Sequence, residues 1–242
     1  MSFLILTLIL NMKKGEEKLT QKQMDRILSE RTVLLDKCRN APEGGEKVEF
    51  LGKSFTVFRN AYRPRSESVP LVKNFKIKKG ETVLDACTGT GHIAIFAAEK
   101  GAEKVVAFDK SPFNVRSALE NVSNHGMGAR VQVREGDMFR CIDRKEMFDV
   151  IVCNPPFTNQ PASDAVDSYV YDQNFRVHKE LFAGAKKHLK PTGRMYITQA
   201  NFGNINDMKK LAKKCGFSIK QIGEYQKPNH PSIFYAFELK RK

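Results

Sequence analysis

The sequence has few cysteines, and their spacing does not suit a metal site. Its 242 residues include five, none in a Cys-x-x-Cys pair and one left over from any pairing: Cys38, Cys87, Cys141, Cys153 and Cys215. A zinc site and a disulfide framework are therefore not expected, and we predict no bound metal. Unpaired cysteines are typical of a reducing compartment, which predicts a cytoplasmic protein.

A hydrophobic run long enough to cross a membrane is also missing. The first ten residues, MSFLILTLIL, are apolar, but a spanning helix needs about 20 such residues. No positive charge precedes them and no small-residue cleavage site follows, so they make a poor signal peptide. We therefore expect no membrane span. One interpretation is that the native protein starts at Met12, where MKKGEEKLTQ reads as a soluble N-terminus; the other is that residues 1–11 associate with a membrane or a partner.

Acidic residues are in the minority. Asp and Glu total 27 against 41 Lys and Arg, which gives a formal net charge of +14. Such a surface attracts polyanions, nucleic acid first among them, although a general preference for lysine in the source organism explains the same composition. The basic residues are spread along the chain, with mild clusters at 209–214 and 240–242 and no dense basic arm.

The first 69 residues read as an extension that precedes the main domain. Residues 20–38 have apolar side chains near helical spacing, and Thr20 with Gln23 can form a capping box. Residues 41–45, APEGG, break the chain, and residues 48–58 resemble a hairpin. We therefore predict a short helical and hairpin extension over 1–69.

From residue 70 to residue 242 the pattern alternates between strands and helices. Strands are predicted at 81–87, 104–110, 130–137, 148–154 and 194–200, and helices at 91–101, 112–126, 172–190 and 205–216. This alternation favours an α/β fold with a Rossmann-like, doubly wound, mostly parallel sheet. The last two strands, SIKQIGEY and SIFYAFELK, are joined by QKPNHP, which predicts an antiparallel edge at the C-terminus.

A glycine-containing loop follows the first strand of this domain. In VLDACTGTGHIA, Gly89 and Gly91 with Ala94 fit the G-x-G-x-x-G/A pattern, in which ligand and backbone approach closely. Alone, this match also fits a nicotinamide dinucleotide site or a tight turn.

Acidic residues at the ends of three successive strands favour a different cofactor. Asp85 precedes the glycines, Asp109 ends the second strand, and Asp137 ends the third within EGDMF. S-adenosylmethionine carries an ammonium and a sulfonium and no phosphate, so an acid beside the loop suits it. Asp109 can accept its ribose hydroxyls. Asp137 can accept its adenine amino group, with Met138 and Phe139 covering the ring. The residues predicted to contact the cofactor are Asp85, Cys87, Thr88, Gly89, Gly91, Asp109, Lys110, Asp137, Met138 and Asn154.

The series VLDACTGTG, VVAFD, EGDMF and VCNPPF resembles the class I S-adenosylmethionine-dependent methyltransferases, over about residues 70–220. In that superfamily an Asn-Pro-Pro-aromatic motif at the fourth strand marks enzymes that methylate a planar nitrogen. The resemblance implies that the catalytic residues are Asn154, Pro155, Pro156 and Phe157.

The chemistry of a planar nitrogen suits this motif. Its lone pair is delocalised, so it must be oriented toward the methyl carbon for transfer. The side-chain carbonyl of Asn154 and the backbone carbonyl of Pro155 can each accept one N–H, which also stabilises developing positive charge. The two prolines stiffen the turn, and Phe157 can stack on the planar group. The proton leaves after attack, so no strong base is needed.

The segment before the cofactor loop bears on the acceptor. FLGKSFTVFRNAYRPRSESVPLV resembles the entry segment of the HemK-type release-factor glutamine methyltransferases, which carry a Pro-Arg-x-acid-Thr-Glu stretch. Pro64, Arg65, Glu67 and Ser68 match it, whereas Val69 replaces the final acid. This family also ends its motif in tyrosine where Phe157 stands, and has a larger N-terminal domain. The resemblance implies a protein glutamine acceptor, with substrate contacts from Tyr62, Arg65, Phe157 and Tyr169.

The main alternative is methylation of a ribosomal RNA, transfer RNA or DNA base, at the exocyclic amine of adenine or guanine. A flipped base would stack on Phe157 and the net charge would hold phosphates. The predicted acceptor loop is residues 158–175, where Asp164, Asp167 and Asp172 occur and no basic residue appears before Arg176. This composition is unusual for a phosphate-facing loop and slightly favours a protein or small-amine acceptor. A small-molecule N-methyltransferase and a cofactor-binding module without catalysis are further alternatives. We predict an S-adenosylmethionine-dependent N-methyltransferase of a macromolecule, with protein glutamine as the first candidate.

Overall fold

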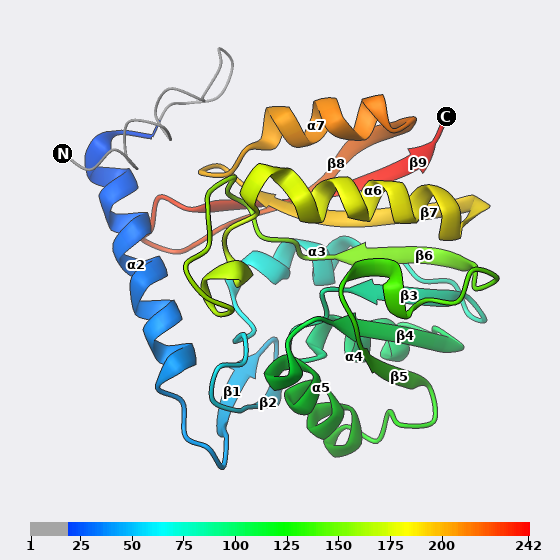
Figure 1. Ribbon diagram of the computed structural model, residues 1–242, viewed down its shortest axis with the longest axis horizontal. Coiled ribbons are helices and arrows are strands. Elements are labelled where there is room, and N and C mark those ends of the chain that lie inside the picture. The colour runs from blue at the N-terminus through cyan, green and yellow to red at the C-terminus, as the bar shows by residue number, and fades with distance from the viewer. Residues whose placement is uncertain (1–18) are drawn as a thin grey trace.

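The computed structural model describes residues 19–242 (Figure 1). The apolar first ten residues and Met12 lie outside the described residues. The chain forms a two-stranded hairpin and a seven-stranded sheet in the order β5-β4-β3-β6-β7-β9-β8. The sheet strands are β3 (Thr82–Ala86), β4 (Lys104–Asp109), β5 (Val131–Glu135), β6 (Phe148–Cys153), β7 (Leu189–Ala200), β8 (Phe217–Gln226) and β9 (Ile233–Arg241).

Six strands of this sheet run in one direction, and β9 alone runs in the opposite direction. Strands β5, β4, β3, β6 and β7 run parallel, whereas β9 pairs antiparallel with both β7 and β8. The mostly parallel sheet with an antiparallel C-terminal edge confirms the predicted fold class. The chain first extends the sheet outward from β3 through β4 to β5 and then returns to β3's other side with β6, so a topological switch point lies between β3 and β6.

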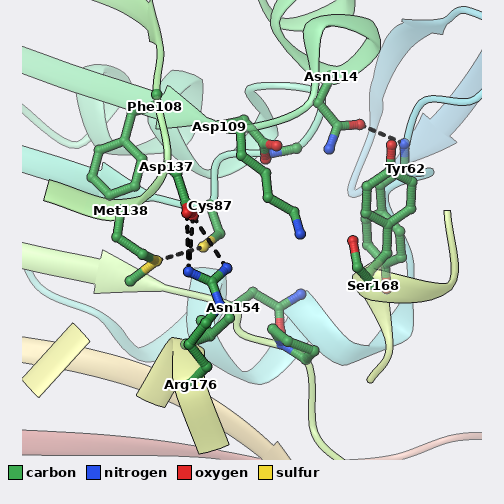
Figure 2. A pocket seen from close by; sticks show the side chains of 16 residues that line it. Tyr62, Cys87, Phe108, Asp109, Asn114, Asp137, Met138, Asn154, Ser168 and Arg176 are labelled. Atoms are coloured by element: carbon green, nitrogen blue, oxygen red, sulfur yellow. Dashed lines mark hydrogen bonds and ion pairs between the residues drawn. The ribbon is translucent and has the colours of Figure 1, made fainter. Parts of the chain in front are cut away.

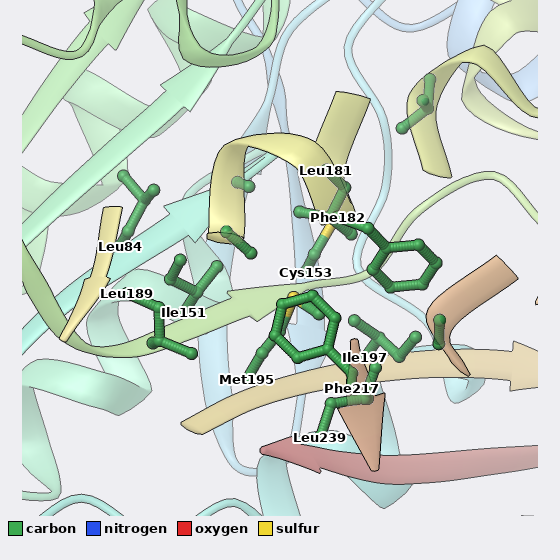
Figure 3. Packing of buried hydrophobic residues seen from close by; sticks show 14 of the residues in the cluster. Leu84, Ile151, Cys153, Leu181, Phe182, Leu189, Met195, Ile197, Phe217 and Leu239 are labelled. Atoms are coloured by element: carbon green, nitrogen blue, oxygen red, sulfur yellow. The ribbon is translucent and has the colours of Figure 1, made fainter. Parts of the chain in front are cut away.

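Helices cover both faces of the sheet. They are α3 (Val69–Asn74), α4 (His92–Glu99), α5 (Pro112–Asn124), α6 (Arg176–His188) and α7 (Ile205–Lys214). Successive residues of a strand point to opposite faces, and in β3 Val83 joins the core under α3, α4 and α5, whereas Leu84 joins the core under α6 and α7. Figure 3 shows the second core, where Leu181 and Phe182 of α6 meet the sheet.

Three elements differ from expectation. The helix predicted from residue 172 begins at Arg176, because Asn174 and Phe175 adopt left-handed backbone conformations. Strand β7 begins at Leu189 directly after α6 and includes the Pro-Thr-Gly stretch that was expected to separate them, with a register shift against β6. Helix α3 was not predicted; it is short and carries a proline in its first turn.

The N-terminal segment packs on the far end of the chain. Helix α2 (Gln21–Arg39) carries the predicted capping box, and β1 (Glu46–Phe50) pairs with β2 (Lys53–Val57) as the predicted hairpin. Met24 and Ile27 of α2 pack in a buried cluster with Phe202 and Phe234. No helix within residues 19–242 is long and apolar enough to span a bilayer.

Candidate active site

A partly open cleft, called the main cleft here, lies beyond the carboxyl ends of β3, β4, β5 and β6. Open α/β sheets bind ligands at this edge, at the switch point. Figure 2 shows its lining, to which segments after all four strands contribute. The lining residues are Tyr62, Cys87, Gly89, Phe108, Asp109, Lys110, Asn114, Gly136, Asp137, Met138, Asn154, Pro156, Ser168, Tyr169, Arg176 and Val177.

Asp109 ends β4 and lines the main cleft with a buried side chain. Its two carboxylate oxygens accept the backbone N–H groups of Gly89 and Ser111, each at 2.9 Å. The carboxylate therefore ties the glycine loop to the start of α5. Burial raises the pKa of Asp109. Each oxygen keeps further acceptor capacity, so Asp109 can also accept ligand hydroxyl groups.

The loop between β3 and α4 lines the main cleft through Cys87 and Gly89, both with a φ of 56°. This left-handed region suits glycine and costs a residue with a Cβ about 1–2 kcal/mol, so Cys87 holds a strained position. Gly91 does not line the cleft. Its φ is 81°, and a Cβ there would lie 3.1 Å from the Cα atom of Ala118. Gly91 therefore permits α4 to pack on α5, and its contact with the cofactor remains a prediction.

Asp85 and Thr88 lie beneath the loop and do not line the cleft. The Thr88 hydroxyl donates to one Asp85 oxygen at 2.6 Å, and the other oxygen has no hydrogen-bond partner among residues 19–242. Burial raises the pKa of Asp85 from its ordinary value of 3.8 to about 7. Both side chains are fully buried beneath the loop, and the contact of these two residues with the cofactor remains a prediction.

Asp137 lines the main cleft but is already paired. Both Nη atoms of Arg176 donate to its carboxylate at 3.0–3.2 Å, as Figure 2 shows. An adenine amino group would share this carboxylate with Arg176. Met138 lines the cleft as expected. Phe139 does not; its ring packs 5.9 Å from that of Phe108, on the side of α6.

Asn154 lines the main cleft with its side-chain amide held at both ends. Its Oδ1 accepts a short hydrogen bond from the Thr198 hydroxyl, and its Nδ2 donates to Ser68 Oγ at 3.0 Å. Ser68 Oγ in turn lies 2.9 Å from Nε2 of His92. Burial lowers the pKa of His92 to about 3, so this imidazole stays neutral at physiological pH. The network fixes which end of the Asn154 amide presents oxygen.

The end of the Asn-Pro-Pro-Phe motif faces a second cleft. Pro156 lines the main cleft and Pro155 is buried, whereas Phe157 lines a neighbouring, partly open cleft, called the side cleft here. Tyr62 lines both clefts. The side cleft is lined by Ile27, Glu30, Arg31, Leu34, Tyr62, Arg65, Glu67, Phe157, Val170, Phe202, Lys227, His230, Ser232 and Phe234.

The four predicted substrate contacts are divided between these clefts. Arg65 and Phe157 line only the side cleft, and Tyr169 lines only the main cleft. The rings of Tyr62 and Tyr169 meet edge to face at 5.6 Å. The backbone N–H of Tyr62 donates to Asn114 Oδ1 at 2.7 Å, and its hydroxyl makes a short hydrogen bond to Glu67. The two tyrosines therefore form a wall of the main cleft.

The three aspartates of the loop 158–175 form ion pairs or hydrogen bonds with other residues of the protein. Arg39 of α2 pairs with Asp164 at 2.8 Å and with Asp167 at 2.6 Å. Asp172 is buried and accepts from the backbone of α6 and from His178 Nδ1 at 2.7 Å. Each of these carboxylates therefore already has a cationic or N–H partner. The loop's acidity says nothing about the charge of the acceptor.

Sequence reasoning did not select several lining residues: Phe108, Asn114, Gly136, Ser168, Arg176 and Val177. Phe108 and Gly136 directly precede the selected acids Asp109 and Asp137, so the sequence motifs would have included them if each had been extended by one residue. Arg176 was visible as the first basic residue after the loop. Asn114 and Ser168 carry no motif signal, since tertiary packing alone brings them to the cleft.

The main cleft suits S-adenosylmethionine. Carboxylates of Asp109 and Asp137 offer acceptors at the ends of neighbouring strands, and Phe108, Met138 and Val177 offer apolar walls. Within residues 19–242 no three His, Cys, Asp or Glu side chains gather in a way that could hold a metal ion.

Known proteins resemble the chain in sequence. The family described as Methyltransferase small domain matches residues 66–225. A Methanocaldococcus jannaschii protein, provisionally named protein N5-glutamine methyltransferase, is 29% identical over 187 residues, 72% of this chain and 89% of that protein. The release factor glutamine methyltransferase of Cereibacter sphaeroides is 31% identical over 165 residues, 63% of this chain and 58% of that protein. This chain thus spans little more than half of that bacterial relative.

Solved structures share the fold. The 16S rRNA guanosine methyltransferase of Thermus thermophilus, solved with S-adenosylmethionine and guanosine, superposes with a TM-score of 0.59 at 18% identity, over 82% of this chain and 50% of that one. A ribosomal protein methylase of Lactobacillus delbrueckii superposes with a TM-score of 0.51 at 22% identity, over 69% of this chain and 72% of that one.

The fold, the main cleft and these relationships define a class I S-adenosylmethionine-dependent methyltransferase. Within this class the chain belongs to the methyltransferase small domain family. The predicted enzyme class, cofactor and family resemblance are thereby confirmed.

Proposed function

We propose that this enzyme methylates the side-chain amide nitrogen of a glutamine in a protein of the translation apparatus. The observation that carries the proposal is the position of the Asn-Pro-Pro-Phe motif between two adjoining clefts. Asn154 and Pro156 line the main cleft, where the cofactor fits, and Phe157 lines the side cleft. An acceptor that enters by the side cleft therefore meets the motif at the boundary with the cofactor site.

The motif supplies orientation in this proposal. The bound cofactor supplies an electrophilic methyl group. Asn154 Oδ1 already accepts from Thr198 and keeps a second lone pair, which can accept one amide N–H of the substrate. The backbone carbonyl of Pro155 can accept the other. Because Thr198 and Ser68 hold the Asn154 amide before substrate arrives, little reorganisation is needed when positive charge develops on nitrogen.

The names of relatives support glutamine over other acceptors. Proteins named release factor glutamine methyltransferase match this chain from Cereibacter sphaeroides, Clostridium acetobutylicum and Borreliella burgdorferi. The match in Borreliella covers 93% of this chain at 24% identity, so it includes the N-terminal segment. The family's planar-nitrogen chemistry is consistent with an Asn-Pro-Pro-Phe motif in this position.

The proposal is tested by following a labelled methyl group. Purified enzyme and labelled S-adenosylmethionine are added to extract of a strain that lacks the gene, and the products are split between nuclease and protease treatment. We expect the label to be lost on protease treatment and to map to glutamine in peptide analysis. Label that survives protease and is lost with nuclease would replace this proposal by a nucleic-acid acceptor. Label in neither fraction would move the acceptor to a small molecule.

An RNA base is the second candidate, and one observation favours it. The net charge of +14 would hold phosphates around a base inserted at Phe157. The nuclease arm of the same experiment detects this activity directly.

A further inference from the structure

The side cleft contains a buried cation without an anionic partner. Arg31 of α2 has a relative exposure of 7%, and its Nη1 atom has no hydrogen-bond partner among residues 19–242. No carboxylate of the described chain lies within ion-pair distance of it. A buried charge costs several kcal/mol unless it is paired, so an arginine kept in this state needs an explanation.

The other charges of the side cleft are already matched. Glu30 pairs with Lys227, with His230 Nε2 at 3.2 Å and with Arg65 at 3.9 Å. Glu67 accepts from Tyr62 and lies 3.8 Å from Arg65. Arg31 is therefore the cation of this cleft that has no carboxylate partner among residues 19–242, and its Nη1 atom remains to be satisfied.

Aromatic rings hold the Arg31 guanidinium in place. Its Cζ lies 5.3 Å from the ring centres of both Tyr171 and Phe202. The Tyr171 side chain also hydrogen-bonds the guanidinium. A contact with the π-face of a ring leaves the remaining N–H groups available, and Nη1 has no hydrogen-bond partner among residues 19–242. Phe202 also contacts Phe157, with ring centres 6.1 Å apart. The Phe202 ring thus lies between the free donor of Arg31 and Phe157 of the Asn-Pro-Pro-Phe motif.

We propose that Arg31 binds a main-chain carbonyl oxygen of the acceptor polypeptide, next to the glutamine that reaches Asn154. This rests on the proposed function. The oxygen is that of a carbonyl, because a single donor atom, Nη1, is left without a partner, whereas an acidic side chain is typically bound by both prongs of the guanidinium fork. Helix α2 thereby contributes to acceptor binding in addition to packing on the domain.

The test compares variants of helix α2. Arg31→Met keeps most of the apolar stem and removes the donor, and Arg31→Lys keeps the charge without the planar fork. Arg26→Met is the matched control, because Arg26 is exposed on the same helix. Each protein is assayed for label transfer into the protease-sensitive fraction of extract from the gene-deleted strain, at several extract concentrations. The dissociation constant for S-adenosylmethionine and the melting temperature are measured in parallel.

We expect Arg31→Met to raise the apparent KM for the protein fraction about tenfold to a hundredfold, as loss of a charged hydrogen bond does. Arg31→Lys should show a smaller rise, and Arg26→Met none. Cofactor affinity should stay within about twofold, and the melting temperature should not fall, because an unpaired buried charge is removed.

An unchanged apparent KM in both Arg31 variants would overturn the assignment. It would also be overturned if a fall in cofactor affinity and melting temperature accounted for the whole rise in apparent KM. If Arg31→Met does not fold, the apparent KM of Arg31→Lys alone tests the assignment. Failure of the wild-type enzyme to label protein would instead contradict the proposed function itself, which separates the two failures.

Discussion

Asn154 shows how neighbouring side chains prepare one amide for its role. Thr198 donates to its oxygen, and its nitrogen donates to Ser68, which also contacts the neutral His92. Each partner comes from a different element: Thr198 from β7, Ser68 from the turn before α3, and His92 from α4. The orientation of a single side chain thus depends on three distant parts of the sequence.

Replacement of Asn154 by alanine should remove methyl transfer and leave cofactor binding. Loss of one preorganised acceptor typically lowers kcat about 10²–10³-fold, and Asn154 also holds Ser68 in place. Single-turnover transfer and calorimetric binding of S-adenosylmethionine measure the two quantities. Transfer at a rate near that of the wild type would show that the motif does not orient the acceptor.

Asp85 predicts a pH dependence of stability. Its folded-state pKa of about 7 lies above its ordinary value of 3.8, so the folded protein binds the proton more tightly than the unfolded chain. The stability that Asp85 contributes is fully present below the lower value and is lost as the pH rises through about 7. Asp85→Asn should therefore gain stability relative to the wild type across this window, by about 4 kcal/mol at most.

Urea denaturation of both proteins between about pH 4 and pH 8 measures that difference. The gap should widen up to about pH 7 and then level off. A constant gap over the whole range would mean that Asp85 does not hold a proton in the folded state.

At the scale of elements, loop 158–175 is held to α2 by charge. Arg39 pairs with both Asp164 and Asp167, and Val166 between them packs on Leu34 and Leu35. Because the Arg39 side chain is 33% exposed, the pairs add little to global stability, about 1 kcal/mol or less. Their effect is local: they position the segment that carries Ser168 and Tyr169 of the main cleft.

Arg39→Ala should speed proteolysis within 158–175 several-fold with little change in melting temperature. Local opening exposes this loop without global unfolding. Mass spectrometry of the fragments gives the cleavage site and rate. Arg59→Ala is the control, since the Arg59–Glu43 pair is exposed and lies outside the loop. Equal rates in the two variants would show that α2 does not hold the loop.

The contact of α4 with α5 depends on Gly91. Gly91→Ala adds a Cβ 3.1 Å from Ala118 in a left-handed position, and we expect a loss of about 2–3 kcal/mol. Gly126→Ala is the control, because its φ is 66° but nothing lies within 4 Å of the added atom. Its loss should be about 1 kcal/mol, the conformational cost alone. Equal losses in denaturant titrations would show that helix packing tolerates the extra atom.

Sequence predicted the local patterns and could not predict which of them share a surface. The capping box at Thr20, the strand that ends in Asp109, the strand that ends just before Asn154, and the antiparallel edge all arise from short-range signals. The pairing of Asp137 with Arg176 joins residues 39 positions apart. The side cleft joins α2 to the turn after β8. Such contacts follow from tertiary packing, which a pattern in one sequence does not encode.

On the scale of the whole molecule, the two basic clusters at 209–214 and 240–242 lie away from α2 and the side cleft that it borders. Helix α6 begins at the main cleft with Arg176 and ends with Lys186 and Lys187. Arg241 contacts the Lys186 carbonyl, and Lys242 donates to Gly216, directly after α7. Figure 1 places this C-terminus on the opposite side of the molecule from α2, which borders the side cleft. The clusters expected from sequence are thus separated from the motif that orients the acceptor.

This separation predicts a weak dependence of methyl transfer on salt. A nucleic-acid acceptor held through six to ten phosphates loses about 10³–10⁵ in affinity between roughly 50 and 200 mM salt. A protein acceptor should lose less than about tenfold in affinity over the same range of salt. The carboxylates of the side cleft are already paired, and Arg31 is the one cation lining this cleft without a carboxylate partner among residues 19–242. The apparent KM for the protein fraction measured across this range decides between them. A steep logarithmic slope would place phosphates in the binding site and assign the net charge of +14 a direct part in catalysis.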